Sequence, residues 1–381
     1  MNSTLVVPRE SVLASPSTAV KPVIRPRHFP KAKKDRITSI DSMRAVANLA
    51  VITGHWFSFL GPSGNASYQL AFLFLGNLSN VTAPFFFIVS GFFLHRSVKS
   101  GKKLSSAFSR LYSRIMVIYL FWMALYTFAP IFGLRSIFQG DFVRIHEQTV
   151  LVFSQIGENF LTFMMTSNTP HLWFLPALII ANGLMILMLN AKMEKWLLPI
   201  GTLAYIVFIM KVPYEIIFGA SALPLEWIRI LPAFFFVTIG YCLNSEKFRS
   251  KAKLGLALLV AGFFLKIVER LFLVNILSSS NDFCFLISTP VISAGAFLFA
   301  ISCPEWGKGT ILPVIGKYSL GIYAAHVFIQ YRLFDSDIFS PAMKFTAPFY
   351  VHIVGIGLIY ALSLMFIYLA SRWRRLKSFI I

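Results

Sequence analysis

The feature that most constrains the fold is a series of apolar runs, each about 20 residues long. In an α-helix such a run rises ~1.5 Å per residue and crosses a hydrocarbon core of ~30 Å. Backbone polar groups in lipid must be paired internally, so the runs form helices or a closed barrel. The period-two alternation of membrane strands is absent. The sequence therefore predicts an all-α polytopic membrane protein, in keeping with 57% hydrophobic and 13% charged residues.

We predict about ten transmembrane helices within a transmembrane domain over 37–371. A flexible basic cytoplasmic tail is expected over 1–36, because this segment lacks apolar periodicity. A short basic cytoplasmic tail is expected over 372–381. The predicted spans are 41–60, 70–94, 112–133, 171–190, 196–212, 227–243, 254–275, 283–302, 312–331 and 347–370.

The charge distribution sets the predicted orientation. The net charge is +20, and 26 of the 35 Lys and Arg residues fall on one side of the predicted membrane. This is the positive-inside bias, and it predicts that both termini are cytoplasmic. The basic charge is thereby explained without nucleic-acid binding. Three cysteines lie far apart in the chain, and neither a disulfide framework nor a metal-ligand spacing is evident.

Ionisable residues inside the first span indicate function. Arg44 and His55 are 11 residues apart, which is three helical turns plus ~20° and ~16 Å along the axis. Asp41 and Asn48 fall on the same stripe. A snorkelling arginine and a paired interior histidine would be the structural alternative. Because charged groups in a bilayer are costly, we favour a functional track for the four together.

A second polar face is predicted in the ninth span. Ser319, Tyr323, His326 and Gln330 follow one another at steps of four, three and four, which places them on one helical face. A hydrogen-bonded seam between helices is an equally good interpretation.

Other residues are candidates at the two ends of the spans. Ser90 and Gly91 form a small step that allows close helix approach. His171 and Trp173 open the fourth span at the outer interface, where a Trp is also typical of an aromatic belt. Lys266, Glu269 and Arg270 share a face of the seventh span; an internal ion pair with a further cation and a substrate contact are both open. The segment 150–163 could be an interfacial helix or a plain connector.

The chemistry that fits this arrangement is acyl transfer. A neutral imidazole such as His55 can take a proton from a hydroxyl and later return it. Arg44 can hold phosphate oxygens, with help from the basic loop that contains Arg110 and Arg114. A phosphate-rich cytoplasmic donor such as acetyl-CoA would then meet an acceptor hydroxyl near His55. No GxSxG nucleophile motif and no metal constellation competes.

These residues together resemble the membrane-bound acyltransferase-3 family, over about residues 37–370. That family carries Arg-x10-His in the first span, a Phe-rich segment ending in Ser-Gly, a His-x-Trp-(Phe/Tyr)-Leu segment and a late Ser-x-Gly-Ile-Tyr-x-x-His segment. In chain order the matches are Arg44 and His55; Phe85 to Gly91; His171, Trp173 and Phe174; and Ser319, Gly321, Tyr323 and His326.

The resemblance implies ten core helices and transfer of an acyl group, usually acetyl, from cytoplasmic acyl-CoA to a hydroxyl of a cell-surface or lipid-linked glycan. It implies a bacterial inner-membrane location, no bound cofactor, a catalytic role for His55 and a donor role for Arg44. One departure is that the family's Arg-x-x-Arg-Pro appears here as Arg110 and Arg114, spaced by four and without the proline.

Two alternatives belong to other functional classes. A transporter or flippase for a lipid-linked glycan would be favoured by deep carboxylates and inverted repeats. Glu269 is the one strong intramembrane carboxylate candidate in the sequence, and no inverted repeat is visible. A non-catalytic scaffold accounts poorly for two polar stripes that each contain a histidine.

Overall fold

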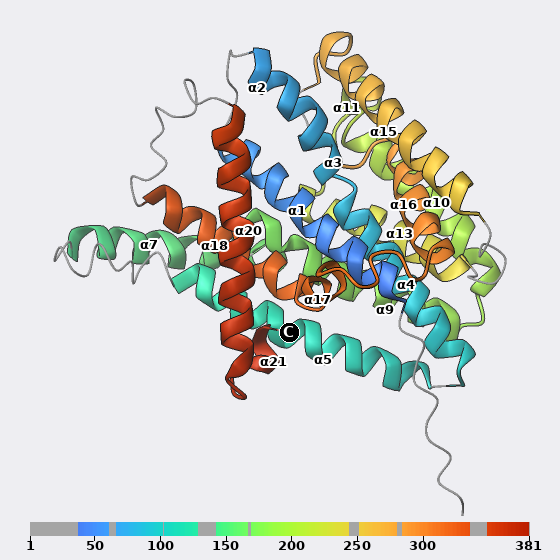
Figure 1. The fold of residues 1–381 in the computed structure, drawn as a ribbon, viewed down its shortest axis with the longest axis horizontal. Helices are drawn as coiled ribbons and strands as arrows, with labels where there is room; N and C mark the ends of the chain where they lie inside the picture. The colour runs from blue at the N-terminus through green and yellow to red at the C-terminus, as the bar shows by residue number, and fades with distance from the viewer. Residues whose placement is uncertain are drawn as a thin grey trace, which may run out of the picture. The chain divides into compact units, whose positions relative to one another are not determined.

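The described part of the chain is built from helices (Figure 1). All regular structure in these residues is helical, as the sequence predicts. The predicted tail 1–36 lies outside the described residues. The computed structural model describes residues 37–60, 66–101, 103–128, 142–166, 169–243, 251–279, 284–335 and 349–380.

Among the described residues, five helices are long and apolar enough to cross a membrane: Tyr68–Lys99, Leu104–Phe128, His171–Asn190, Leu225–Cys242 and Phe349–Arg372. Each overlaps a predicted span. Several other predicted spans correspond to helices that are shorter or more polar than this criterion allows, including the first. A membrane protein is thereby supported, whereas the count of ten and the cytoplasmic termini stay predictions.

The helices have the following bounds. The first half contains α1 (Thr38–Leu60), α2 (Ala66–Ala71), the π-helix η1 (Phe72–Gly76), α3 (Asn77–Ser79), α4 (Thr82–Lys99), α5 (Leu104–Phe128), α7 (Phe142–Glu158), α8 (Phe160–Thr166), the 3₁₀-helix η2 (Pro170–Trp173) and α9 (Phe174–Asn190). The second half contains η3 (Glu194–Trp196), α10 (Leu197–Lys211), α11 (Glu215–Phe218), α12 (Leu225–Ile228), α13 (Ile230–Cys242), α15 (Ala252–Asn275), α16 (Thr289–Ser302), α17 (Leu312–Gly316), α18 (Ser319–Asp335), α20 (Phe349–Arg372) and α21 (Lys377–Ile380).

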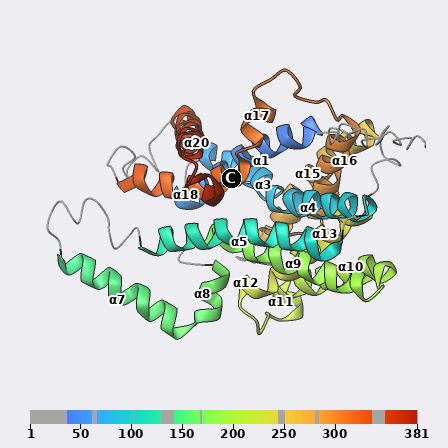
Figure 2. The ribbon, with the colours of Figure 1, turned by 90° about the horizontal axis from the view of Figure 1, so that it is seen from below.

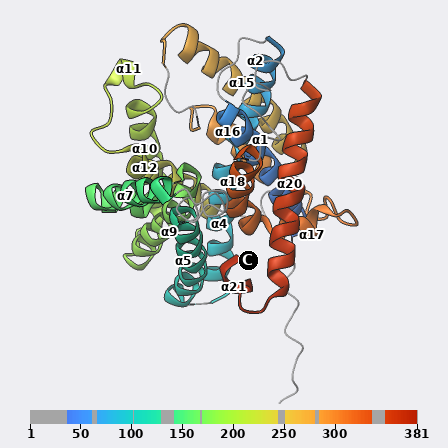
Figure 3. The same ribbon diagram turned by 90° about the vertical axis from the view of Figure 1, so that its left-hand side faces the viewer.

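Helix α1 is surrounded by other helices. It packs against α3, α4, α16, α17, α18 and α20, and Figure 3 shows α20 running beside α1 and α18. The Thr82 hydroxyl donates to the Ala47 carbonyl at 3.2 Å, and the Tyr360 hydroxyl donates to the Ala45 carbonyl at 2.9 Å. Hydrogen bonds from two neighbouring helices therefore fix the rotation of α1 about its own axis.

The predicted span 70–94 lies within the candidate span Tyr68–Lys99, which is not a uniform α-helix. The helix passes from α2 through η1 to α3, and α4 begins after a turn at Asn80 and Val81. A π-helix re-aims the side chains that follow it and is often found at functional sites. Gly54 of α1 allows α3 to approach closely, because a Cβ there would lie 2.2 Å from the Ser79 Oγ.

Helices α4 and α13 meet backbone to backbone. A Cβ built on Gly91 would lie 1.9 Å from the Val237 carbonyl oxygen, and one built on Gly240 would lie 1.9 Å from the Ile88 carbonyl oxygen. Small residues permit such close packing of membrane helices. The close approach predicted at the Ser90-Gly91 step is confirmed.

Helix α5 lies between two groups of helices (Figure 2). It packs on α9 on one side and on α18 and α21 on the other. The predicted tail 372–381 contains α21, whose Ile380 is only 2% exposed. Its carbonyl oxygen would lie 2.5 Å from a Cβ on Gly321 of α18. The segment 150–163 is helical in α7 and α8, although its position at an interface stays a prediction.

We expect Gly91→Ala to lower the free energy of unfolding by about 1–3 kcal/mol, because the added methyl group displaces the Val237 backbone. Gly357→Ala on α20 is the matched control, since a Cβ there meets no atom within 4 Å. Thermal unfolding of the detergent-solubilised proteins, followed by fluorescence, measures the difference. Equal unfolding midpoints for the two variants would contradict the close packing of α4 and α13.

Candidate functional site

Three histidines from separate elements meet in the structure. His55 lies on α1, His171 on η2 and His326 on α18. The ring centroids of His55 and His326 are 5.1 Å apart, those of His171 and His326 are 5.3 Å apart, and those of His55 and His171 are 5.9 Å apart. The sequence proposed each histidine separately, and the fold brings all three together.

The His326 ring has a defined protonation pattern. Its Nδ1 lies 2.6 Å from the Tyr323 carbonyl oxygen. A carbonyl oxygen only accepts, so Nδ1 carries the proton and Nε2 of the neutral ring is an acceptor. The ring is fully buried, and Nε2 has no hydrogen-bond partner among the described residues. A buried acceptor of this kind indicates that another group, such as a water or a substrate hydroxyl, completes the site.

Tyrosine hydroxyls hold the histidines in place. The Tyr323 hydroxyl donates to the His171 carbonyl oxygen. The hydroxyl of Tyr126, on α5, donates to the Ala324 carbonyl at 2.7 Å and accepts from the Phe328 backbone N–H at 2.9 Å. These two backbone groups are four residues apart on α18. The Tyr126 hydroxyl therefore bonds to both ends of a single turn of that helix. The Tyr126 ring also lies 5.1 Å from His171.

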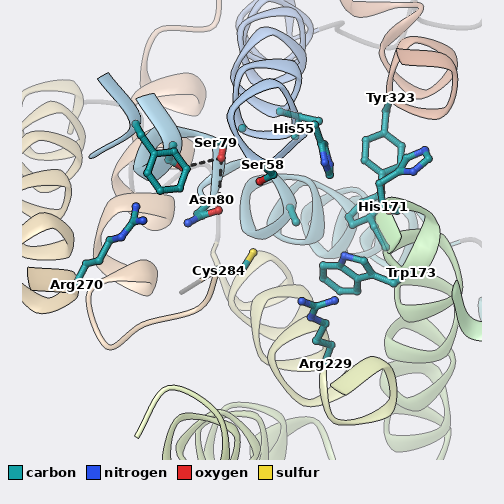
Figure 4. Close-up of a pocket in the computed structure, with 16 residues that line it drawn as sticks. His55, Ser58, Ser79, Asn80, His171, Trp173, Arg229, Arg270, Cys284 and Tyr323 are labelled. Carbon is teal, nitrogen blue, oxygen red and sulfur yellow. Dashed lines mark hydrogen bonds between the residues drawn. The ribbon is translucent and has the colours of Figure 1, made fainter. Parts of the chain in front are cut away.

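His55 faces a cavity of about 330 Å³. Figure 4 shows His55 and Ser58 on α1, with Trp173 and Arg229 across from them and Arg270 on another side. The lining combines aromatic faces, hydroxyl and amide groups and two arginines. The residues are Val51, Gly54, His55, Ser58, Phe72, Gly76, Ser79, Asn80, Ala83, His171, Trp173, Phe174, Arg229, Arg270, Cys284 and Tyr323.

Both arginines of the cavity stack on aromatic rings. The Arg229 guanidinium carbon is 5.0 Å from the centroid of the Trp173 ring, and that of Arg270 is 4.7 Å from the Phe72 ring. Trp173 is buried, so the tryptophan is not the exposed anchor that an aromatic belt would place there. At these distances a cation is attracted to the face of an aromatic ring.

Lys266 and Glu269 secure the wall of the cavity near Cys284. The Lys266 ammonium donates to the Cys284 carbonyl at 3.1 Å and to the Thr289 Oγ1 at 3.0 Å. Glu269 accepts from the Tyr214 hydroxyl at 2.9 Å and from the backbone N–H groups of residues 287 and 288 at 2.8 and 2.9 Å. These N–H groups precede α16, so the carboxylate caps the start of that helix.

The remaining predicted residues of the first two spans lie away from the cavity. Arg44 Nη1 is 3.4 Å from Asp41 Oδ1, and its guanidinium carbon is 5.9 Å from the Phe93 ring centroid. Asn48 Nδ2 donates to the Ser319 carbonyl at 2.9 Å. The Ser90 hydroxyl donates to Asn182 at 3.2 Å. None of the four predicted residues lines the cavity.

Of the two predicted basic residues of α5, the structure describes the side chain of one. Arg114 is exposed on α5, and the side chain of Arg110 lies outside the described residues. Within the part of the chain that the structure describes, no group of three or more His, Cys, Asp or Glu side chains could hold a metal ion.

Sequence reasoning missed several residues of the site. Ser58, Ser79 and Asn80 carry no distinctive spacing, and Tyr126 looks like any tyrosine in an apolar run. Arg229 had a signal that could have been used, since it is an arginine inside the predicted span 227–243 and far from the basic loops.

One family of known proteins matches this chain. No curated protein and no solved structure matches the chain significantly. A family model described as an acyltransferase domain matches residues 37–372, which is most of the chain and includes all three histidines. The chain therefore belongs to the acyltransferase-3 family, whose members transfer acyl groups.

Proposed function

We propose that the protein is an O-acyltransferase that moves an acyl group, most simply acetyl, from cytoplasmic acyl-CoA to a hydroxyl of a cell-surface or lipid-linked glycan. The observation that carries the proposal is the position of His55, which lines a cavity of about 330 Å³ and has two further histidine rings within 6 Å. The family assignment supports acyl transfer over the transporter or flippase alternative.

His55 acts as the general base in the proposed reaction. Its neutral imidazole takes the proton of the acceptor hydroxyl as the hydroxyl oxygen attacks the thioester carbonyl carbon. The tetrahedral intermediate collapses, the carbon–sulfur bond breaks, and the imidazolium returns the proton to the departing CoA thiolate. The products are an ester and CoA, and the histidine ends in its starting state.

His326 and His171 position His55 and the acceptor. The Nε2 acceptor of His326 can receive a hydrogen bond from His55, since the centroids of the two rings are 5.1 Å apart. His171 is buried beside Tyr323 and Tyr126, which restricts its ring. Fixed donors and acceptors in surroundings of low polarity stabilise developing charge without having to reorganise during the reaction.

The donor is proposed to bind at the other end of α1. Arg44 lies 11 residues before His55, or ~16 Å along the helix axis. Its planar guanidinium can bind phosphate oxygens of acyl-CoA in a bidentate fashion. Arg110 and Arg114 of α5 are further candidates for this role, and Asp41 restrains the Arg44 side chain.

The cavity suits a saccharide. Sugar rings present apolar C–H faces that pack on aromatic side chains, and their hydroxyls need hydrogen-bonding partners. The cavity provides the rings of Trp173 and Phe72 together with the hydroxyl and amide groups of Ser58, Ser79 and Asn80. We place the reaction in a bacterial inner membrane, with acyl-CoA and a glycan as partners and no role for nucleic acid.

Replacing His55 tests the general base. We expect His55→Ala to reduce acetyl transfer roughly 10²–10⁴-fold, because the variant lacks the imidazole that is proposed to accept the hydroxyl proton. The measurement is transfer of radiolabelled acetyl from acetyl-CoA into surface glycan in membranes. His146→Ala, an exposed histidine on α7, is the matched control and should retain full activity. Wild-type transfer by a correctly inserted His55→Ala protein would sink the proposal.

Replacing Arg44 tests the donor site. We expect Arg44→Gln to weaken acetyl-CoA binding about tenfold or more, because a charge-assisted contact to phosphate is lost. Arg44→Lys should lose less, since it keeps the charge but not the bidentate geometry. Titration calorimetry of the solubilised proteins gives the dissociation constants. Lys308→Gln, which alters an exposed cation paired with Glu305, is the control. Unchanged donor affinity in Arg44→Gln would exclude this role.

A further inference from the structure

A further buried histidine lies close to α1 but takes no part in the proposed transfer. His352 lies in the first turn of α20, and only 4% of it is exposed. It does not line the cavity that His55 faces. A polar ring buried among membrane helices is costly unless it has a partner, and such residues usually have a role. The presence of a histidine at this position therefore needs a physical reason.

The His352 ring accepts a hydrogen bond from Trp56 of α1. The indole Nε1 of Trp56 is 3.2 Å from the His352 Nδ1, and the two ring planes meet at 73°. An indole N–H only donates, so Nδ1 is the acceptor and the proton of the neutral imidazole is on Nε2. The bond therefore requires this neutral tautomer of histidine, or another side chain with an acceptor at the same place.

The Trp56 indole fits into a slot on α20. Trp56 is only 1% exposed, and a Cβ built on Gly355 would lie 2.2 Å from the indole Cη2. Gly355 is three residues after His352, so the two residues share a face of α20. The glycine leaves room for the indole ring, and the histidine accepts from its N–H group. Because a buried N–H that loses its acceptor is costly, these two contacts together restrain the position and the orientation of the ring.

This restraint acts on the helical turn that carries His55. Trp56 directly follows His55, so the two side chains leave α1 ~100° apart. Gln330 of α18 donates to the carbonyl oxygen of His55 itself at 3.1 Å. A rotation or shift of α1 that moved the His55 ring would also move the Trp56 indole out of its slot. His352 and Gln330 thus restrain the same turn of α1 from two neighbouring helices.

We infer that His352 is a positioning residue of the acyl transfer, which holds His55 in place through its hydrogen bond with the Trp56 indole. This inference rests on the proposed function and adds a residue outside the cavity lining on which the rate depends. A general base must lie within hydrogen-bonding reach of the proton that it takes. A displacement of about 1 Å can lower a rate about 10²-fold. Loss of the bond should therefore lower kcat and leave donor binding at Arg44 unchanged.

Substitutions of His352 test the inference through the steady-state kinetics of acetyl transfer in membranes. His352→Leu removes the acceptor, and we expect kcat to fall about tenfold or more while the KM for acetyl-CoA stays near that of the wild type. His352→Asn carries its amide oxygen on Cγ, where histidine carries Nδ1, so it should restore most of the lost kcat. Val354→Leu is the matched control and should have wild-type kinetics, because Val354 is on the same turn of α20 and is 62% exposed.

Removing the donor of the bond gives a second measurement. Trp56→Phe lacks the indole N–H, so we expect it to lower kcat as well. His352→Leu should then add little to the loss, because both substitutions break the same bond. Unfolding midpoints of the detergent-solubilised proteins separate this effect from loss of the fold. If His352→Leu does not fold, Trp56→Phe and His352→Asn supply the comparison.

Several outcomes would overturn the inference. These are wild-type kcat in His352→Leu, no recovery in His352→Asn, additive losses in the double variant, and a change in KM that accounts for the whole loss. Loss of the fold in both His352→Leu and Trp56→Phe would assign the contact to stability alone and would overturn it too. All of these leave the proposed function standing. Absence of acetyl transfer by the wild-type protein would refute the proposed function and the inference with it.

Discussion

The structure depends on pairing polar groups where water is scarce. Leaving a buried donor or acceptor unpaired costs about 1–3 kcal/mol, whereas pairing it adds a smaller net gain. Three side chains from neighbouring helices donate hydrogen bonds to backbone carbonyl oxygens of α1, namely those of Thr82, Tyr360 and Gln330. Gln330 donates to the carbonyl of His55 itself, at 3.1 Å. The rotation of α1, and with it the direction of His55, follows from these bonds.

The residues of the two predicted polar stripes differ in how their hydrogen-bonding groups are paired. Asn48 on α1 donates to the Ser319 backbone on α18, so this part of the stripe is a seam between helices. His326, on the α18 stripe, instead presents a buried acceptor beside His55. The structural interpretation, a seam between helices, is thus confirmed for Asn48, whereas a functional role for His326 stays a prediction.

The sequence predicted the features that depend on the residue pattern of a single helix. The apolar runs predicted the helical class, and helical periodicity placed His55 and His326 on polar faces. The small Ser90-Gly91 step predicted a close helix contact, which the structure forms between α4 and α13. Distances between helices follow from packing across the whole chain, so the meeting of three histidines needed the structure or a family resemblance. The π-helix η1 was not predicted, because an apolar run gives no sign of a local change in helical hydrogen bonding; the predicted span 70–94 itself corresponds to the candidate span Tyr68–Lys99. Arg229 was not predicted as a site residue, because the Lys and Arg residues were used to predict the orientation in the membrane. An arginine within a span was not considered as a possible part of a cavity.

The Tyr126 hydroxyl has a consequence for how α5 and α18 are held together. It bonds to a carbonyl and an N–H that are four residues apart on α18, so α18 cannot slide along α5 without breaking two hydrogen bonds. His326, two residues after Ala324, is therefore held in position relative to α5. The same helix, α18, contributes Tyr323 to the lining of the cavity that His55 faces, so the two bonds also fix that part of the lining relative to α5.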